Sequence, residues 1–192
     1  MTTPGDHELV AAANAGDRDA LDQLLRRHHA RIAAVCRRMT GNEADGADAA
    51  QEALLAIVRG LHRFDGRSSF GTWAYRVAVN ASLDELRRRR RRPTDSLDDL
   101  DRHHDEPSVR SPESAVVDRL ALAEGVAALS EEYRVAVILR DIGDLDYSEI
   151  ADVLDVAVGT VKSRIARGRS ILARELGNRD DDPERPSTGR NG

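Results

Sequence analysis

Apolar residues recur at every third or fourth position in two separate stretches of the chain, which is the spacing of a helix with one buried face. In the first stretch, residues 6–92, the recurring positions are Leu21, Leu24, Leu25, His28, Ile32 and Val35, and then Ala50, Leu54, Ile57, Val58 and Leu61. Turn residues at Gly16–Asp17 and Thr40–Gly41–Asn42 divide this stretch into helices. No segment shows the sustained alternation of Val, Ile and Thr that is typical of a strand. The pattern therefore predicts an all-α protein.

The second helical stretch, residues 114–177, contains a helix-turn-helix pattern. Asp146 is followed three positions later by Glu149, which predicts a capping box at the start of a helix. We expect this helix to span Tyr147–Leu154 and to be buried through Ile150, Ala151 and Leu154. A short break then leads into a second helix that begins near Gly159.

Residues 93–113 separate the two helical stretches and contain seven acidic residues, two arginines and three prolines. This composition offers too little apolar surface to support a packed structure. We therefore expect two small helical domains, residues 6–92 and 114–177, joined by a flexible acidic linker. The polar tail, residues 178–192, is expected to be disordered.

The composition narrows the class of protein further. Because aromatic residues make up only 3% of the 192 residues, the cores must be built mainly from Leu, Val, Ile and Ala. The single cysteine, Cys36, excludes an intramolecular disulfide and has the spacing of a core residue.

The N-terminus lacks a signal-peptide pattern and no apolar run approaches the ~20 residues that cross a membrane, so we expect a cytoplasmic protein without membrane insertion. The adjacent pairs His28–His29 and His103–His104 lack further ligands at metal-binding spacing, so we expect no metal, no cofactor and no enzyme.

The basic segment GTVKSRIARGR, residues 159–169, stands out in a chain of net charge −5 because it holds four basic residues and no acidic one. At about 100° per residue, its helix would bury one face formed by Val161, Ile165, Gly168 and Leu172. The opposite face would present Lys162, Ser163, Ala166 and Arg167. A narrow ridge of cations and a hydroxyl fits the major groove of DNA, so the pattern predicts DNA binding.

Two longer segments resemble conserved regions of bacterial sigma factors of the extracytoplasmic-function (ECF) type. The segment LSEEYRVAVILRDIGDLDYSEIADVL, with the VGTVKSRIARGR that follows, resembles the fourth conserved region. The segment DGADAAQEALLAIVRGLHRFDGRSSFGTWAYRVAVNASLDELRRR resembles the second, including its QE pair and its F-x-G-x-S-x-F loop. The two matches occur in the order found in the family and together cover most of residues 6–177. The resemblance implies a transcription initiation factor that directs core RNA polymerase to promoters.

The resemblance also implies three sets of contact residues. The set expected to dock on the clamp helices of the polymerase β′ subunit is Asp48, Gln51, Glu52 and Leu55. The set expected to bind and melt −10 DNA is Phe64, Gly66, Arg67, Ser68, Ser69, Arg76, Asn80, Arg87 and Arg88. The set expected to read −35 DNA is Thr160, Lys162, Ser163, Arg164, Ala166 and Arg167. Phe70 and Trp73 are interpreted as core anchors of the −10 loop.

The resemblance implies further partners and leaves alternatives open. Core RNA polymerase, through its β′ and β subunits, promoter DNA and an anti-sigma factor are the expected partners. The acidic linker is expected to thread a basic cleft of the polymerase.

Asp155 stands in the helix-turn-helix bend where the family often has glycine, and aspartate tolerates the left-handed conformation. The alternative class is a stand-alone helix-turn-helix regulator, which leaves the upstream loop and the QE helix unexplained.

Overall fold

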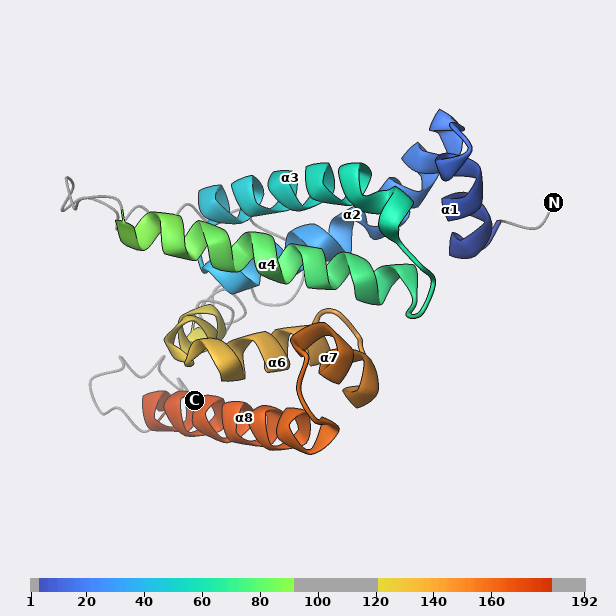
Figure 1. Cartoon of the computed structure of the whole chain (residues 1–192). Helices are drawn as coiled ribbons and strands as arrows, with labels where there is room; N and C mark the ends of the chain where they lie inside the picture. The colour runs from blue at the N-terminus through green and yellow to red at the C-terminus, as the bar shows by residue number, and fades with distance from the viewer. Residues whose placement is uncertain (1–3, 92–120, 181–192) are drawn as a thin grey trace, which may run out of the picture.

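The computed structural model of the chain describes residues 4–91 and 121–180, and all regular structure in these ranges is helical (Figure 1). Residues 4–91 form an N-terminal lobe of four α-helices and one short 3-10 helix. These are α1 (Asp6–Asn14), α2 (Arg18–Thr40), α3 (Glu43–Gly60), η1 (Leu61–Arg63) and α4 (Phe70–Arg91). The C-terminal lobe contains helical residues 121–128, α6 (Glu131–Asp141), α7 (Tyr147–Leu154) and α8 (Val158–Asp180). The prediction of an all-α protein with two helical domains is confirmed.

Two of the predicted boundaries of these domains fall outside the described residues. The acidic linker, residues 93–113, lies there entirely, as does Arg92 at the expected end of the first domain. Most of the expected tail also lies there, although α8 continues to Asp180, beyond the predicted helix end at residue 177.

The helix ends of the N-terminal lobe follow the predicted turn signals. The Asp17 carboxylate accepts hydrogen bonds from the backbone N–H groups of Asp19 and Ala20, at 2.9 and 3.1 Å, and so caps α2. Gly41 ends α2 in the left-handed conformation with a φ of 69°, which glycine adopts without strain. The side chain of Asn42 then caps α3 through the N–H of Asp45.

The core of the N-terminal lobe lies where α2, α3 and α4 pack together. Leu24, Ile32, Ile57 and Ala74 are almost completely buried there. The prediction was wrong for Val58, which is 41% exposed, because the helix turns this position toward solvent beside Leu55. Four further predicted core positions are only half-buried: Leu21, Leu25, His28 and Leu54.

Cys36 is a buried core residue, as predicted. Burial raises the pKa of its thiol, and a hydrogen bond with Ser82 offsets part of this effect. Because the thiolate is the reactive form, we expect alkylation of Cys36 at pH 8 to be at least about tenfold slower in the native protein than in guanidinium chloride. Mass spectrometry after iodoacetamide treatment measures this, and an exposed control cysteine in Gln23→Cys should react at a similar rate in both conditions. Equal native rates for the two cysteines would contradict the buried position.

The C-terminal lobe is held together by close packing of α8 on α6 and α7. A Cβ added at Gly168 of α8 would lie 2.7 Å from Cγ2 of Val137, so only glycine permits this approach of α8 to α6. In α7, Ile150 and Ala151 are buried as predicted. Val153 rather than Leu154 is the third buried residue, and Leu154 is only partly buried at the end of the helix.

The two lobes pack directly against each other, with α7 beside α4 and α6 beside α2 (Figure 1). One apolar cluster crosses the boundary and joins Val35, Met39, Tyr75 and Val79 of the N-terminal lobe to residues of α6, α7 and α8. The guanidinium of Arg134 in α6 also donates a hydrogen bond of 3.1 Å to the backbone carbonyl of Met39. This shared core was not predicted from the sequence.

Candidate nucleic-acid interface

The helix-turn-helix of the C-terminal lobe is formed by α7, a tight turn and α8. Asp146 caps α7 by accepting a hydrogen bond of 2.8 Å from the N–H of Glu149, whose carboxylate accepts one of 2.9 Å from the N–H of Asp146. The predicted capping box is therefore present. Asp155 ends α7 in the left-handed conformation with a φ of 52°, as expected for the bend. These local features set the angle at which α8 leaves the turn.

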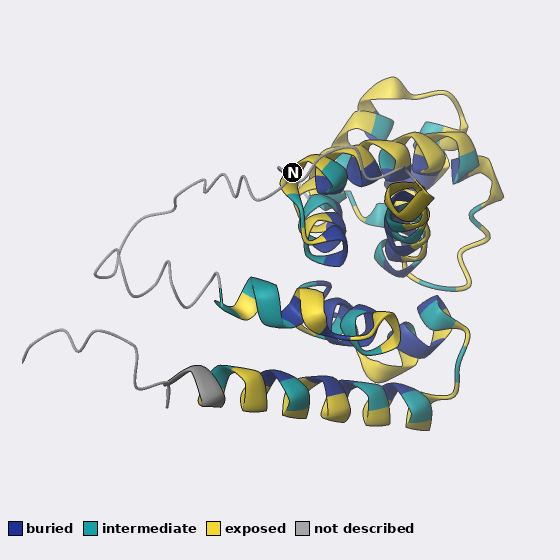
Figure 2. Ribbon diagram, turned by 90° about the vertical axis from the view of Figure 1, so that its left-hand side faces the viewer, coloured by how far each residue is buried: buried dark blue, intermediate teal, exposed yellow. Residues whose placement is uncertain are grey.

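The first turns of α8 divide into the two faces that the helical wheel predicts. Val161, Ile165, Gly168 and Leu172 are buried against α6 and α7. The opposite side of α8 is exposed along its length (Figure 2). It carries Lys162, Ser163, Ala166 and Arg167.

The two other residues predicted to read −35 DNA are less accessible. Thr160 is half-buried, and its carbonyl accepts a hydrogen bond of 2.8 Å from the Ser163 hydroxyl. The side chain of Arg164 is 24% exposed and forms an ion pair of 3.3 Å with Glu132 of α6. The exposed face, defined by Lys162, Ser163, Ala166 and Arg167, is called the α8 ridge below.

One edge of the α8 ridge rests on an aromatic ring that the sequence did not single out. Tyr147, the first residue of α7, is 37% exposed. Its ring centroid lies 5.7 Å from the Lys162 ammonium and 5.3 Å from the Arg140 guanidinium, within the range of cation–π attraction. Arg169 lies about two helical turns beyond Lys162 in α8 and forms an ion pair with Asp141 of α6. The position of a tyrosine at the start of a helix does not distinguish a cation–π contact from burial in the core. The sequence analysis therefore missed the role of Tyr147.

In the N-terminal lobe, the loop between η1 and α4 rests on an aromatic cluster. Phe64, Phe70 and Trp73 lie with ring centroids 5.5 to 5.9 Å apart, in edge-on or tilted contacts. Phe70 is buried and Trp73 half-buried, in agreement with their interpretation as anchors. The half-buried Phe64 belongs to the same cluster, so its ring supports the loop.

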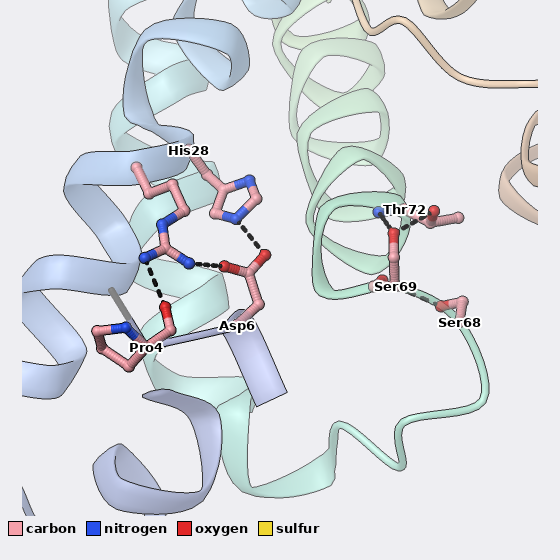
Figure 3. Close-up of polar contacts among 7 residues, drawn as sticks. Pro4, Asp6, His28, Ser68, Ser69 and Thr72 are labelled. Atoms are coloured by element: carbon pink, nitrogen blue, oxygen red, sulfur yellow. Dashed lines mark hydrogen bonds and ion pairs between the residues drawn. The ribbon is translucent and has the colours of Figure 1, made fainter. Parts of the chain in front are cut away.

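The polar residues of this loop fall into two groups. The Ser69 hydroxyl caps α4 by accepting a hydrogen bond of 3.0 Å from the N–H of Thr72 (Figure 3). Gly66, with a φ of 72°, makes the turn that leaves Arg67 exposed and paired with Asp65. Gly66 and Arg67 are thus exposed, while the aromatic cluster and the Ser69 cap hold the two ends of the loop in place.

The end of the loop, at Phe70, is also braced by the first turn of α1. The Asp6 carboxylate lies 2.6 Å from the Arg27 guanidinium and 2.7 Å from Nε2 of His28 (Figure 3). The His28 ring in turn meets Phe70 edge-on at a centroid distance of 5.0 Å. The first turn of α1 is therefore tied to α2, and through His28 it is linked to Phe70 at the end of the loop.

The exposed face of α4 carries Arg76 and Asn80, both predicted to bind −10 DNA. Asn80 is exposed one turn beyond Arg76. The Arg76 guanidinium donates a hydrogen bond of 2.5 Å to the backbone carbonyl of Asp152 in α7. Part of the predicted −10 surface is thus in contact with the other lobe.

Three arginines of the run at the end of α4, Arg87 to Arg89, are paired within the lobe. Arg87 forms an exposed ion pair of 2.8 Å with Asp84, and Arg89 forms one of 2.9 Å with Asp45 of α3. Arg88 lies 3.1 Å from the carboxylate of Glu85, which is buried. Exposed pairs of this kind are worth about 0–1 kcal/mol, so Arg87 can exchange its partner for a phosphate at little cost.

The predicted polymerase-docking residues form one exposed ridge on α3. Asp48, Gln51, Glu52 and Leu55 are all exposed, and Leu55 is 40% exposed. Val58, one turn beyond Leu55, extends the apolar part of this ridge. Leu55 and Val58 thus place two exposed aliphatic side chains at one end of the polar ridge.

The predicted contact residues therefore occupy three surfaces: the α8 ridge, the loop with the exposed face of α4, and the ridge on α3. Within the ranges 4–91 and 121–180, no group of three or more His, Cys, Asp or Glu side chains is placed to hold a metal ion. No helix in the described part of the chain has the length and apolarity needed to span a membrane.

Comparison with known proteins matches both lobes to one family. Residues 24–92 match the family described as Sigma-70 region 2, and residues 119–172 match Sigma-70, region 4. The ECF RNA polymerase sigma factor SigM of Mycobacterium tuberculosis is 40% identical over 172 residues, which cover 90% of this chain and 85% of that protein. The ECF RNA polymerase sigma-E factor of Escherichia coli is 34% identical over 176 residues, covering 87% and 92%.

A solved structure shows the same arrangement of helices. CnrH, in its complex with the cytosolic domain of CnrY, superposes with a TM-score of 0.70 at 25% sequence identity. The superposition covers 90% of this chain and 97% of CnrH.

A helical lobe with an anchored loop and a second lobe with a helix-turn-helix define a two-domain sigma factor. The chain belongs to the ECF group of the sigma-70 family. It is therefore a sigma factor for transcription initiation, and the comparisons give no support to a stand-alone regulator.

Proposed function

We propose that this sigma factor reads −35 DNA with the α8 ridge and opens −10 DNA with the loop and the exposed face of α4. The reaction itself belongs to the polymerase, so the chain is not an enzyme, and it acts in the cytoplasm where that polymerase works. The observation that carries the proposal is the exposure of the α8 ridge, since all four of its residues face solvent on a helix whose other side is buried.

The α8 ridge combines groups for direct base readout and for phosphate contact. The planar fork of Arg167 can donate two hydrogen bonds to one guanine in the major groove. Lys162 and Ser163 are suited to phosphates or base edges, and Ala166 leaves room for close approach. Arg164 is assigned a supporting role, because its pair with Glu132 holds it toward α6.

The loop is suited to capture a base that leaves the DNA stack. Extruding a base costs a few kcal/mol, which contacts in a pocket must offset. Gly66 allows close approach of the backbone, and the exposed Arg67 supplies donors. The hydroxyl of the half-buried Ser68 donates a hydrogen bond of 3.3 Å to the Ser69 carbonyl and would exchange it to contact DNA. The Asn80 amide can pair with a base edge, and the arginine run that begins with Arg87 and Arg88 can follow the DNA backbone.

The ridge on α3 is proposed to dock on the clamp helices of the polymerase β′ subunit, and the C-terminal lobe to contact the β subunit. Leu55 supplies the exposed apolar anchor, and Asp48, Gln51 and Glu52 supply polar contacts around it. We assign residues 6–92 and 114–177 to the two functional domains and residues 93–113 to the linker between them.

An anti-sigma factor is proposed as the regulating partner. The similarity to CnrH in its complex with CnrY supports this proposal, because that structure covers 90% of this chain. The two lobes of this chain are arranged as in CnrH, so a partner that holds both lobes fits the observed fold.

Binding to core RNA polymerase tests the proposed function. The purified chain is mixed with core polymerase at low salt and separated by size-exclusion chromatography. Co-elution with the polymerase is expected, and Gln51→Lys with Glu52→Lys should abolish it because the changes reverse charge on the α3 ridge. Co-elution that survives these changes would exclude this docking surface.

The Tyr147 ring gives a second, smaller prediction. Tyr147→Leu removes the cation–π contact with Lys162 and should weaken binding to −35 DNA about two- to fivefold, as expected for about 0.5–1 kcal/mol at an exposed site. Tyr147→Phe keeps the ring and should bind like the wild type. Fluorescence anisotropy with a −35 duplex measures both, and equal losses in the two variants would assign the effect to the hydroxyl instead.

A further inference from the structure

Asp6, the first residue of α1, contacts two neighbouring side chains of α2 through its carboxylate. One oxygen accepts a hydrogen bond of 2.6 Å from the Arg27 guanidinium, and the other lies 2.7 Å from Nε2 of His28 (Figure 3). Arg27 also donates a hydrogen bond of 2.8 Å to the backbone carbonyl of Pro4. The Asp6 and His28 side chains are only 29% and 16% exposed, so the contact between them is largely shielded from water.

The His28 ring extends this attachment to the end of the loop. It meets the Phe70 ring edge-on at a centroid distance of 5.0 Å, and a Cβ added at Gly71 would lie 3.6 Å from its Cε1. The ring therefore rests on the first turn of α4, where Phe70 is buried. Because the outer torsion of a histidine side chain has no sharp minimum, the contact of Nε2 with Asp6 determines how the ring meets Phe70.

Phe70 in turn supports both ends of the loop. Its ring lies 5.9 Å from that of Phe64, where the loop begins, and 5.7 Å from that of Trp73 in α4. The 3-10 helix η1, which leads into the loop, also contacts α1. Gly66 and Arg67 between the two ends are exposed, so the shape of the loop depends on where its ends are held.

We propose that Asp6 is a positioning residue for promoter opening: through His28 it holds Phe70 and so keeps the loop of residues 64–70 in the shape that receives DNA. This role rests on the proposed function of the loop. A loop that is already ordered does not have to be ordered as DNA enters, which favours opening. The proposal gives a function to α1, which precedes residues 24–92, the part of the chain that matches Sigma-70 region 2.

Three substitutions and one control isolate the contact. Asp6→Ala removes the carboxylate, and His28→Leu removes the ring while leaving the pair of Asp6 with Arg27. Asp6→Asn keeps both contacts, because its carbonyl can accept from Arg27 and its amide can donate to Nε2 of a His28 that carries its proton on Nδ1. Asp22→Ala is the matched control, since Asp22 forms an exposed ion pair of the same 2.6 Å with Arg26 on α2.

Fluorine NMR reports the aromatic cluster directly. Trp73 is the single tryptophan of the chain, so fluorotryptophan places one label in the cluster of the full-length protein. We expect one narrow resonance in the wild type, Asp6→Asn and Asp22→Ala. Asp6→Ala and His28→Leu should each broaden the resonance or add a second one. Because Asp6 acts through His28, adding Asp6→Ala to His28→Leu should cause no further change.

The rate of promoter opening gives the functional readout. Each variant is combined with core polymerase on a promoter mapped with the wild-type chain, and permanganate oxidation of unpaired thymines follows opening. Asp6→Ala should slow opening at least about fivefold, because the loop must then be ordered as DNA enters. Closed complexes should form as in the wild type, and Asp6→Asn should restore the rate. A residue that only stabilised the fold would not affect opening while sparing closed complexes.

The proposal would be overturned by a folded Asp6→Ala with the wild-type fluorine resonance, or by additive effects of Asp6→Ala and His28→Leu. It would also be overturned if Asp6→Ala opened the promoter at the wild-type rate while Asn80→Ala slowed opening. Unchanged opening in both Asp6→Ala and Asn80→Ala would reject the proposed function itself, and the positioning role with it. If circular dichroism shows that Asp6→Ala is unfolded, His28→Leu takes its place with the same two expectations, because it leaves the first turn of α1 unchanged.

Discussion

Arg167→Ala is expected to weaken binding of the chain to −35 DNA by about 1–3 kcal/mol, or about 5- to 150-fold in Kd. The reason is that Arg167, the last residue of the α8 ridge, is exposed and can offer its planar donor fork to one guanine. A −35 duplex selected from a random pool with the wild-type chain provides the probe. Fluorescence anisotropy at fixed salt gives the two Kd values.

Two variants separate base readout from charge. Arg167→Lys keeps the charge and loses the fork, so it should lose discrimination between the selected duplex and a random one while keeping its affinity for the random duplex. Arg26→Ala removes one charge from an exposed pair with Asp22 on the N-terminal lobe and should bind like the wild type. If Arg167→Ala loses affinity equally for both duplexes, Arg167 contacts phosphate and reads no base.

Gly46→Ala is expected to destabilise the N-terminal lobe by about 1–3 kcal/mol, although alanine is the better helix former. An added Cβ at Gly46 of α3 would lie 2.7 Å from Cα and 2.8 Å from Cγ of Arg37 in α2. Since a backbone atom cannot move aside alone, α2 and α3 would have to separate. The expected fall in Tm is roughly 2–12 °C, measured by circular dichroism or calorimetry.

Gly159→Ala is the matched control. A Cβ at Gly159, in the first turn of α8, meets no atom within 4 Å. The same substitution should therefore raise stability by up to about 1 kcal/mol. Equal effects of the two alanines, in either direction, would contradict the close approach of α2 and α3.

The local features of the fold were predictable because neighbouring residues determine them. Asp146 and Glu149 lie three positions apart and form the predicted capping box, and Asp155 adopts the predicted left-handed bend. The buried side of α8 was predicted because it follows from helical periodicity alone. Periodicity assigned Val58 wrongly, since an apolar residue at the edge of a buried face can turn to either side and this one is exposed.

The packing of the two lobes was not predictable from the pattern. Thr72 and Glu149, or Arg134 and Met39, meet only because two folded lobes come together, and no spacing rule relates residues so far apart. Gly46 likewise gives no sign in the sequence that it faces Arg37. For the site, the sequence predicted which residues of α8 are exposed. It did not predict that Arg164 pairs with Glu132 or that Tyr147 supports Lys162.

The central claim is that the two lobes act together with core RNA polymerase to start transcription at specific sites. Run-off transcription from linear bacterial DNA, with the transcript ends sequenced, tests it most directly. Discrete transcripts are expected only when the chain and core polymerase are both present, and Asn80→Ala should reduce open complexes while leaving closed complexes intact. Transcript ends that are the same with and without the chain would contradict the claim.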